Sequence, residues 1–156
     1  MHVKHLSTIT CGIALVASIG LGSGMGGAQD GSTLKVSIIS GTCADPGEVV
    51  HELRDATPST GTEQGSMEAV AVWESETEIR ASLGSFLADA HAIVVADPSD
   101  PQACGDIGGV VDDDRDLSIG LAPLNTPDAF GIAQLDGDDD GGGELEVTVY
   151  VAVPAN

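Results

Sequence analysis

The sequence predicts an all-β fold: an antiparallel Greek-key β-sandwich of seven or eight strands, with one short helical turn near residues 82–90. Three observations support this prediction. Apolar and polar residues alternate with a period of two in several segments, which is typical of strands with one buried face. Turn-forming Gly, Pro and Asp residues separate these segments at roughly 10–15-residue intervals, as in sandwiches of short strands. Only one segment has helical spacing, so we expect no helical layer.

The first half of the chain contains three candidate strands and the helical turn. Residues 34–39 alternate, with Leu34, Val36 and Ile38 on one face. Val49–Arg54 and Met67–Glu74 follow, and we expect Thr77–Ala81 to continue the latter strand past a bend. At the helical turn, Leu83, Phe86 and Leu87 have helical spacing, and Ser82 is a suitable N-cap residue.

The second half contains four more candidate strands. They are His91–Ala96, Asp116–Leu121, Ala129–Leu135 and Gly143–Val153. The last has the strictest alternation, so we expect Val147, Val149 and Val151 to face the core while Glu146 and Thr148 face solvent. A shift of one residue would bury the glutamate.

Residues 1–28 have the pattern of a secretory signal peptide. Lys4 precedes the apolar stretch Leu6–Leu21, and small residues up to Ala28 favour cleavage after that residue. The stretch is shorter than the roughly 20 apolar residues that a membrane-spanning helix needs. We therefore expect a secreted protein with a disordered leader at 29–32 and a single β-sandwich domain at 33–156, within the usual domain size.

The chain is strongly acidic, with 25 Asp and Glu residues against five Lys and Arg and a formal net charge of −20. Nucleic-acid binding is not expected, because phosphate neutralisation needs clusters of basic side chains. Anionic membrane surfaces repel such a chain, so no membrane contact is expected after cleavage of the signal peptide. High net charge also favours a soluble monomer. The expected partner is extracellular and of unknown identity.

Cleavage after Ala28 removes Cys11 and leaves Cys43 and Cys104. An even pair in an oxidising compartment predicts one disulfide. The alternatives are a catalytic thiol or a metal pair, and a metal pair would need ligands from His51 and His91, the remaining histidines.

The segment between the last two strands is the candidate ion site. Asp136, Asp138, Asp140 and Glu144 stand at positions 1, 3, 5 and 9 of a loop with Gly141 at position 6. Such spacing is typical of calcium loops, in which carboxylates converge around a sharp glycine turn. Position 12 is not the Glu of an EF-hand, and the flanking segments are strands. The simpler alternative is a solvated hairpin turn. No cofactor other than calcium is expected.

No catalytic residues are predicted, and we expect a non-enzyme. His51 and His91 lie within apolar segments, where a histidine is more often partly buried and hydrogen-bonded than catalytic. The chain after residue 28 contains no nucleophile elbow, phosphate-binding loop or dinucleotide-binding fingerprint.

Several short motifs resemble a group of small secreted bacterial proteins without an assigned activity. They are Gly41-Thr42-Cys43, His91–Val95, Ala103–Ile107, Gly131-Ile132-Ala133 and Val147–Val151. That group is distantly similar to the copper/zinc superoxide dismutase sandwich, and the resemblance implies the same fold by analogy. Relatives often have His where this chain has Ile39 and Ala96, so the resemblance implies a sandwich without its metal histidines.

These observations favour a secreted non-catalytic β-sandwich with a structural or interaction role. Two alternatives stay open. One is a degenerate superoxide-dismutase-like metal sandwich that has lost its metal histidines. The other is an extracellular binding module stabilised by calcium.

Overall fold

The computed structural model describes residues 33–62, 64–66, 68–97, 100–124, 129–137 and 143–154. The predicted signal peptide and leader lie outside these ranges. The described residues form nine strands and one helix: β1 (Lys35–Gly41), β2 (Pro46–Glu52), β3 (Thr57–Pro58), β4 (Val72–Ile79), α1 (Leu83–Ala88), β5 (His91–Asp97), β6 (Asp100–Asp106), β7 (Asp116–Pro123), β8 (Phe130–Gly137) and β9 (Leu145–Ala152). None of the described helical residues forms a span long and apolar enough to cross a membrane.

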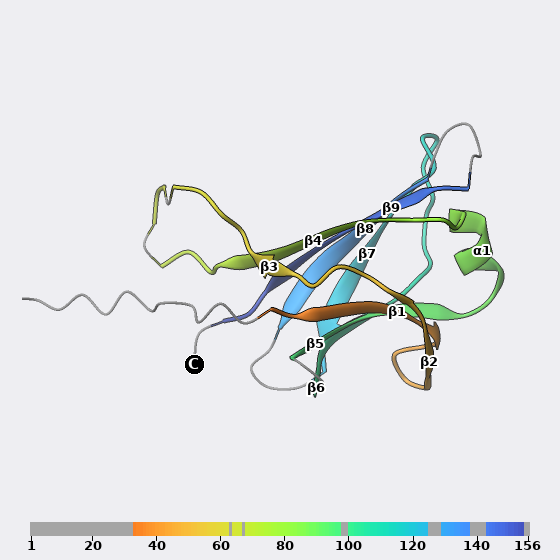
Figure 1. Cartoon of the computed structure of the whole chain (residues 1–156), viewed down its shortest axis with the longest axis horizontal. Helices are drawn as coiled ribbons and strands as arrows, with labels where there is room; N and C mark the ends of the chain where they lie inside the picture. Colours follow the sequence, from red (N-terminus) through yellow and green to blue (C-terminus); the bar gives the residue numbers. More distant parts are fainter. Residues whose placement is uncertain are drawn as a thin grey trace, which may run out of the picture.

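All neighbouring strands are antiparallel, in the order β2-β1-β5-β6-β7-β8-β9-β4-β3. The β6–β7 junction has only two residue pairs, Ala103–Pro123 and Cys104–Ala122. It therefore joins two halves of one curled sheet. Figure 1 shows β1, β2, β5 and β6 below β4, β8 and β9. The antiparallel all-β prediction is confirmed, with nine strands in the described part of the chain rather than seven or eight.

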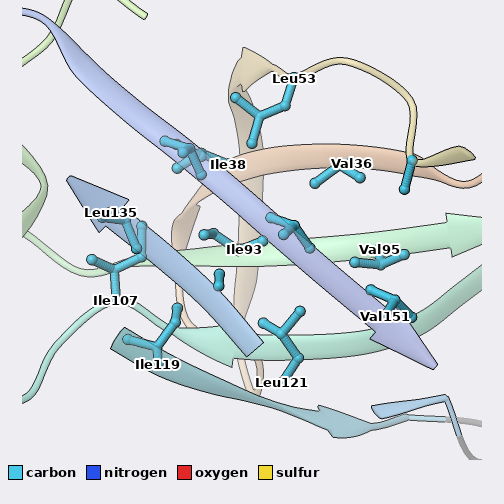
Figure 2. Packing of buried hydrophobic residues seen from close by; sticks show 14 of the residues in the cluster. Val36, Ile38, Leu53, Ile93, Val95, Ile107, Ile119, Leu121, Leu135 and Val151 are labelled. Carbon is cyan, nitrogen blue, oxygen red and sulfur yellow. The ribbon is translucent and has the colours of Figure 1, made fainter. Parts of the chain in front are cut away.

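The two halves of the sheet share one apolar core. In Figure 2, β9 crosses the strands that carry Val36, Ile38, Ile93 and Val95. Val147, Val149 and Val151 have no exposed surface, whereas Glu146 is exposed and Thr148 half-buried, as the alternation predicts. Each fully buried valine or leucine stabilises the fold by about 1.5–3 kcal/mol, so the inner face of β9 is a major source of stability.

The predicted helical turn is present as α1. The Ser82 hydroxyl accepts a hydrogen bond from the Ser85 backbone N–H at 3.3 Å, which makes Ser82 the N-cap. Leu83 and Phe86 are buried in the core, but Leu87 is 41% exposed. The helix is too short to bury all three apolar residues against the sheet.

One strand prediction needs correction, and two strands were not predicted. The strand β4 is continuous from Val72 to Ile79, so it begins later than predicted and no bend divides it. Met67 itself lies outside the described residues. The short strand β3 and the strand β6 have no alternating pattern of their own. β6 forms because it pairs with β5 along its length and with β7 at two residues.

A β-bulge interrupts β2 (Pro46–Glu52), the strand predicted at Val49–Arg54. Ile39 pairs with Val49 and the preceding Ile38 pairs with His51, so β2 contains an extra residue at this point. Val49 and His51 therefore lie on opposite faces despite their even spacing. Val49 is 53% exposed.

Candidate binding face on β4, β7, β8 and β9

The solvent side of β4, β7, β8 and β9 carries acidic side chains at one end and apolar side chains at the other. We call it the outer face. Because directly paired residues of antiparallel strands lie on the same side of a sheet, the register places its side chains in cross-strand rows. From one end to the other, the rows are Asp116–Asp136–Glu146–Glu78, Ser118–Gln134–Thr148–Glu76, Gly120–Ile132–Tyr150–Glu74 and Phe130–Ala152–Val72.

The first of these rows, hereafter the acidic row, consists of carboxylates only: Asp116, Asp136, Glu146 and Glu78. Each is the direct cross-strand neighbour of the next, an arrangement that destabilises a sheet through like-charge repulsion. Burial raises the pKa of the Asp116 carboxyl above its ordinary value, and the charges of Asp136 and Asp112 raise it further. One Asp116 carboxylate oxygen is buried without a hydrogen-bond partner among the described residues.

The acidic row overlaps the predicted calcium site. Asp136 and Glu144 line one hollow of about 190 Å³ together with Glu78 and Glu146. Asp138 and Asp140, the other two predicted ligands, lie outside the described residues. Within the described ranges, no three His, Cys, Asp or Glu side chains come close enough together to hold a metal ion. The structure thus brings together two of the four predicted ligands and adds two that the loop motif did not include.

The opposite end of the outer face carries an apolar patch, formed by Val72, Phe130, Ile132, Tyr150 and Ala152. Phe130 is 49% exposed and Ile132 47% exposed. Ile132 is paired with Tyr150 on one side and with Gly120 on the other. A Cβ atom on Gly120 would have nothing within 4 Å, so the sheet surface beside Ile132 is open.

Tyr150 connects the apolar patch to the acidic strand β4. The negative charge of its cross-strand neighbour Glu74 raises the pKa of the Tyr150 phenol, and burial and a hydrogen bond between the two side chains act in the same direction. An ordinary phenol is already protonated at neutral pH, so the raised pKa only strengthens the role of the hydroxyl as a hydrogen-bond donor.

The pattern of apolar residues in the sequence does not predict this patch. Residues 129–135 have apolar side chains at both parities, so their pattern leaves the buried face undetermined. In the structure Ala133 and Leu135 are fully buried and Phe130 and Ile132 point outward. The small residues at the inner positions were the available signal: a Cβ atom on Gly131 would collide with the Tyr150 carbonyl oxygen.

The two histidines of the described chain flank the ring of Phe86. The ring centroids of His51 and His91 lie 5.6 and 5.2 Å from that of Phe86, both edge-to-face. His91 Nδ1 lies 3.2 Å from each of the Phe86 and Asp89 carbonyl oxygens. Because carbonyl oxygens only accept hydrogen bonds, Nδ1 carries the proton and satisfies carbonyls at the end of α1. Both histidines therefore have packing contacts with the helix.

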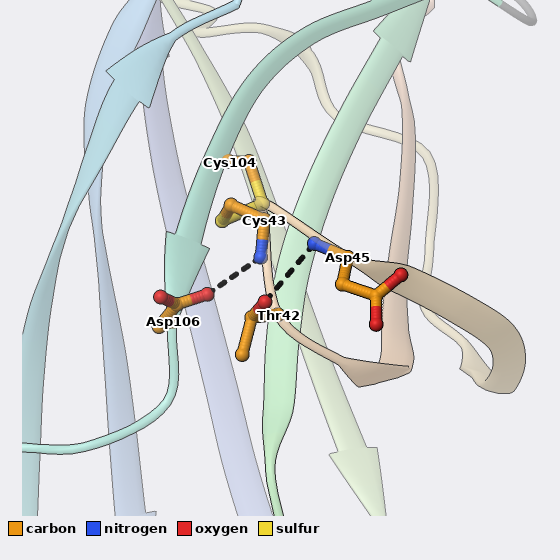
Figure 3. Close-up of a disulfide and its surroundings, with 5 residues drawn as sticks. All are labelled: Thr42, Cys43, Asp45, Cys104 and Asp106. Carbon is orange, nitrogen blue, oxygen red and sulfur yellow. Dashed lines mark hydrogen bonds between the residues drawn. A yellow bond between two sulfur atoms is a disulfide. The ribbon is translucent and has the colours of Figure 1, made fainter.

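The predicted disulfide joins Cys43, in the β1–β2 turn, to Cys104 on β6, with the two Cα atoms 5.8 Å apart. Figure 3 shows the turn around it. The Cys43 backbone N–H donates to the Asp106 carboxylate at 2.7 Å, and the Asp45 N–H donates to the Thr42 hydroxyl at 3.1 Å. Cys104 packs with Ile39 and Ala92 in a small second apolar cluster.

Ile39 and Ala96, the two positions at which the resemblance would place histidines, are far apart. Ile39 pairs with Ala92, and Ala96 lies four residues further along β5, opposite Lys35. Four strand residues span about 13 Å, which exceeds the reach of two histidines on one metal ion. Ile39 is buried in the second apolar cluster.

A second hollow, of about 260 Å³, lies between α1 and the ends of β8 and β9. Its walls are mostly apolar, with Leu83, Leu87 and Val111 among them. Arg115 also lines it and has a left-handed backbone conformation with φ of 67°. The hollow borders Gly143, next to residues outside the described ranges.

No protein-family model, curated protein or solved structure matches this chain.

Proposed function

We propose that this protein is a secreted, non-catalytic β domain that binds an extracellular partner through the outer face of β4, β7, β8 and β9. The observation that carries the proposal is the apolar patch, where Phe130 and Ile132 are about half-exposed on a sheet whose other face already holds the core. A sheet needs only one apolar face to fold. The side chains of the patch therefore require another explanation.

The distribution of aromatic side chains supports this assignment. The chain has four Phe, Trp and Tyr residues. Trp73 and Phe86 are buried in the core, while Phe130 and Tyr150 belong to the apolar patch. Aromatic residues, and Tyr in particular, are enriched in protein–protein interfaces. Contiguous exposed apolar groups with polar neighbours are typical of interaction sites, unlike single scattered ones.

The contacts of the cysteines and histidines support a non-catalytic role. Cys43 and Cys104 are joined in a disulfide, so neither is a thiol nucleophile. His51 and His91 contact Phe86, and His91 Nδ1 is engaged by backbone carbonyls. A disulfide is also compatible with an oxidising, extracytoplasmic compartment, and it supports the secretion that the N-terminal pattern predicts.

We also propose that the two halves of the sheet form a Greek-key sandwich. This proposal is supported by strand pairs between segments far apart in the sequence, β1 with β5 and β4 with β9, and by the core shared between the two halves of the sheet.

A calcium-stabilised module is the second candidate function. The observation that favours it is the hollow in which Asp136 and Glu144, both predicted ligands, lie with Glu78 and Glu146. Calcium takes six to eight oxygen ligands, so Asp138 and Asp140 would have to complete the set. Bound calcium would also relieve repulsion in the acidic row.

Site-specific photo-crosslinking in the medium of the producing cells tests the interaction role. A photoreactive phenylalanine analogue replaces Phe130 in one variant and Val49 in another, because Val49 is equally exposed but lies on β2. We expect a crosslinked product of discrete mass from position 130 and none from position 49. Excess wild-type protein should suppress it, and excess of a Phe130→Ser/Ile132→Thr variant should not. Absence of a product at 130, or equal products at both positions, would contradict the proposal.

A further inference from the structure

We infer that the partner of the outer face is a cationic amphipathic polypeptide, with apolar side chains that rest on the apolar patch and Lys or Arg side chains that meet the surrounding carboxylates. This inference rests on the proposed interaction function and adds the chemical class of the partner.

Carboxylates lie along one edge of the apolar patch, on β4, and across the opposite end of the outer face. Along β4, Glu74, Glu76 and Glu78 occupy the successive outward positions. Across the far end of the face runs the acidic row. The described side chains at the outward positions of β4, β7, β8 and β9 include no Lys, Arg or His. A partner that extends from the patch toward the acidic row therefore meets negative charge on β4 beside it and in the acidic row beyond it, and charge complementarity favours a basic partner.

The spacing of the face sets the size of the partner. Phe130 and Asp136 are six residues apart on β8, which corresponds to about 20 Å at roughly 3.3 Å per residue. A partner helix of about 13 residues has the same length. Its apolar residues would contact Phe130, Ile132 and Tyr150, and its basic residues would reach Glu74 and Glu76 beside the patch or the acidic row beyond it.

The same charges disfavour other occupants. A second copy of this chain would place acidic rows and β4 carboxylates against one another, and like-charge juxtaposition in an interface costs several kcal/mol. An anionic lipid surface would be repelled in the same way. The cost of the acidic row to the isolated domain has a direct explanation if basic side chains neutralise it in the complex.

Titration calorimetry with synthetic peptides tests the inference. The probe is a helical peptide of about 13 residues with Leu and Phe on one face and Lys on the other. One comparison peptide has Glu in place of Lys, and a second has Ser in place of Leu and Phe. We expect the probe to bind wild-type protein at least about tenfold more tightly than either comparison peptide, because both kinds of contact contribute.

Matched variants locate the binding site. Phe130→Ser/Ile132→Thr and Glu74→Gln/Glu76→Gln should each weaken binding of the probe about tenfold. The glutamine pair should also reduce the dependence of binding on salt, because fewer charges are neutralised. Two control pairs on β2, Val49→Thr/Val50→Thr and Glu48→Gln/Glu52→Gln, remove exposed groups of the same kind and should change the affinity less than twofold.

Each alternative outcome has a distinct reading. Equal weakening by the β2 controls would mean that the probe binds any acidic surface, and it would overturn the inference. If the Ser-containing peptide binds as tightly as the probe, the patch has no role in binding. If the protein self-associates in sedimentation and Phe130→Ser abolishes this, the face binds a second copy of the chain. If crosslinking at position 130 succeeds while no cationic peptide binds, the interaction function stands and the partner class is wrong.

Discussion

At the residue scale, two motifs that are 61 residues apart in sequence form one assembly. Gly41 has φ of 84°, and a Cβ atom there would collide with the Asp45 carbonyl oxygen, so the turn into β2 needs glycine. The next two residues contribute the Thr42 hydroxyl that accepts from the Asp45 N–H and the disulfide of Cys43. The motif Ala103–Ile107 supplies the other half of the bridge and, with Asp106, the acceptor for the Cys43 N–H.

Removal of the disulfide should destabilise the fold substantially. The bond closes a loop of 61 residues, and the chain-entropy model assigns about 4 kcal/mol to a loop of this size. We expect Cys43→Ala/Cys104→Ala to lower the free energy of unfolding in urea by about that amount. As a control, a reducing agent should destabilise the wild type and leave the variant unchanged. An alkylatable thiol in freshly secreted protein would contradict the bond itself.

At the element scale, the sheet tolerates a row of charges that no single strand would reveal. Asp116, Asp136, Glu146 and Glu78 each occur at an ordinary solvent-facing position of an alternating strand. They become neighbours only through the pairing register. The buried valines and leucines on the inner face of the same strands stabilise the sheet by more than these repulsions cost, since each cross-strand pair contributes only about 0.2–1 kcal/mol.

The acidic row makes stability depend on pH. The pKa of Asp116 is raised in the folded protein, so the folded state binds its proton more readily than the unfolded chain does. Stability from this group is therefore gained as the pH falls from neutral through the folded pKa toward the ordinary value near 3.8, and it is lost as the pH rises. Asp112, Asp114 and Asp136 are the charged groups that contribute to the shift.

Asp116→Asn should therefore raise the melting temperature at neutral pH. It should also reduce the stability that the protein gains on mild acidification. We expect a stabilisation of roughly 0.2–1 kcal/mol from the lost repulsion. Asp113→Asn is the matched control, because Asp113 is exposed in the turn just before β7, and it should leave the pH profile unchanged. Identical thermal profiles for the two variants would show that the row does not affect stability. Circular dichroism melts at several pH values make this measurement.

At the scale of the whole molecule, net charge and architecture act against each other. The formal charge of −20 favours expansion through self-repulsion. The shared core and the disulfide hold the two halves of the sheet together. Lys35 and Asp55 form an ion pair at 2.9 Å with a largely exposed lysine, so this pair contributes little. Cations that neutralise the surface should stabilise the molecule as a whole.

A comparison of calcium with magnesium separates a specific ion site from general screening. Binding to the folded state alone stabilises it by RT ln(1 + [Ca]/Kd), about 2.7 kcal/mol at a hundredfold excess over Kd. Magnesium prefers rigid octahedral geometry and loses water reluctantly, so a flexible carboxylate loop should give a larger rise in melting temperature with calcium at equal ionic strength. Asp138→Asn/Asp140→Asn should abolish the difference between the calcium and magnesium shifts and leave the shift that both ions share. Equal shifts of the wild type by both ions would identify the loop as a charged hairpin turn.

The local features of this protein could be predicted from short stretches of its sequence. Strict alternation identified β9 and its inner face, because a one-residue slip would bury Glu146. Ser82 and the spacing of Leu83 and Phe86 identified α1, and the even pair of cysteines identified the disulfide. Each of these follows from short-range geometry or from simple counting, so no tertiary information was required.

Strand pairing in the tertiary structure determines which distant residues share a surface. β6 lacks a pattern of its own and forms through its pairing with β5 and β7, and the bulge in β2 reverses the face of Val49. The outer face combines rows from four strands, and its apolar patch arises where Phe130 and Ile132 point away from the core. Their segment has apolar residues at both parities, so the choice depends on strand register and on small inner residues such as Gly131. Cross-strand pairing depends on contacts between segments far apart in the chain. Local patterns in a single sequence therefore do not predict it.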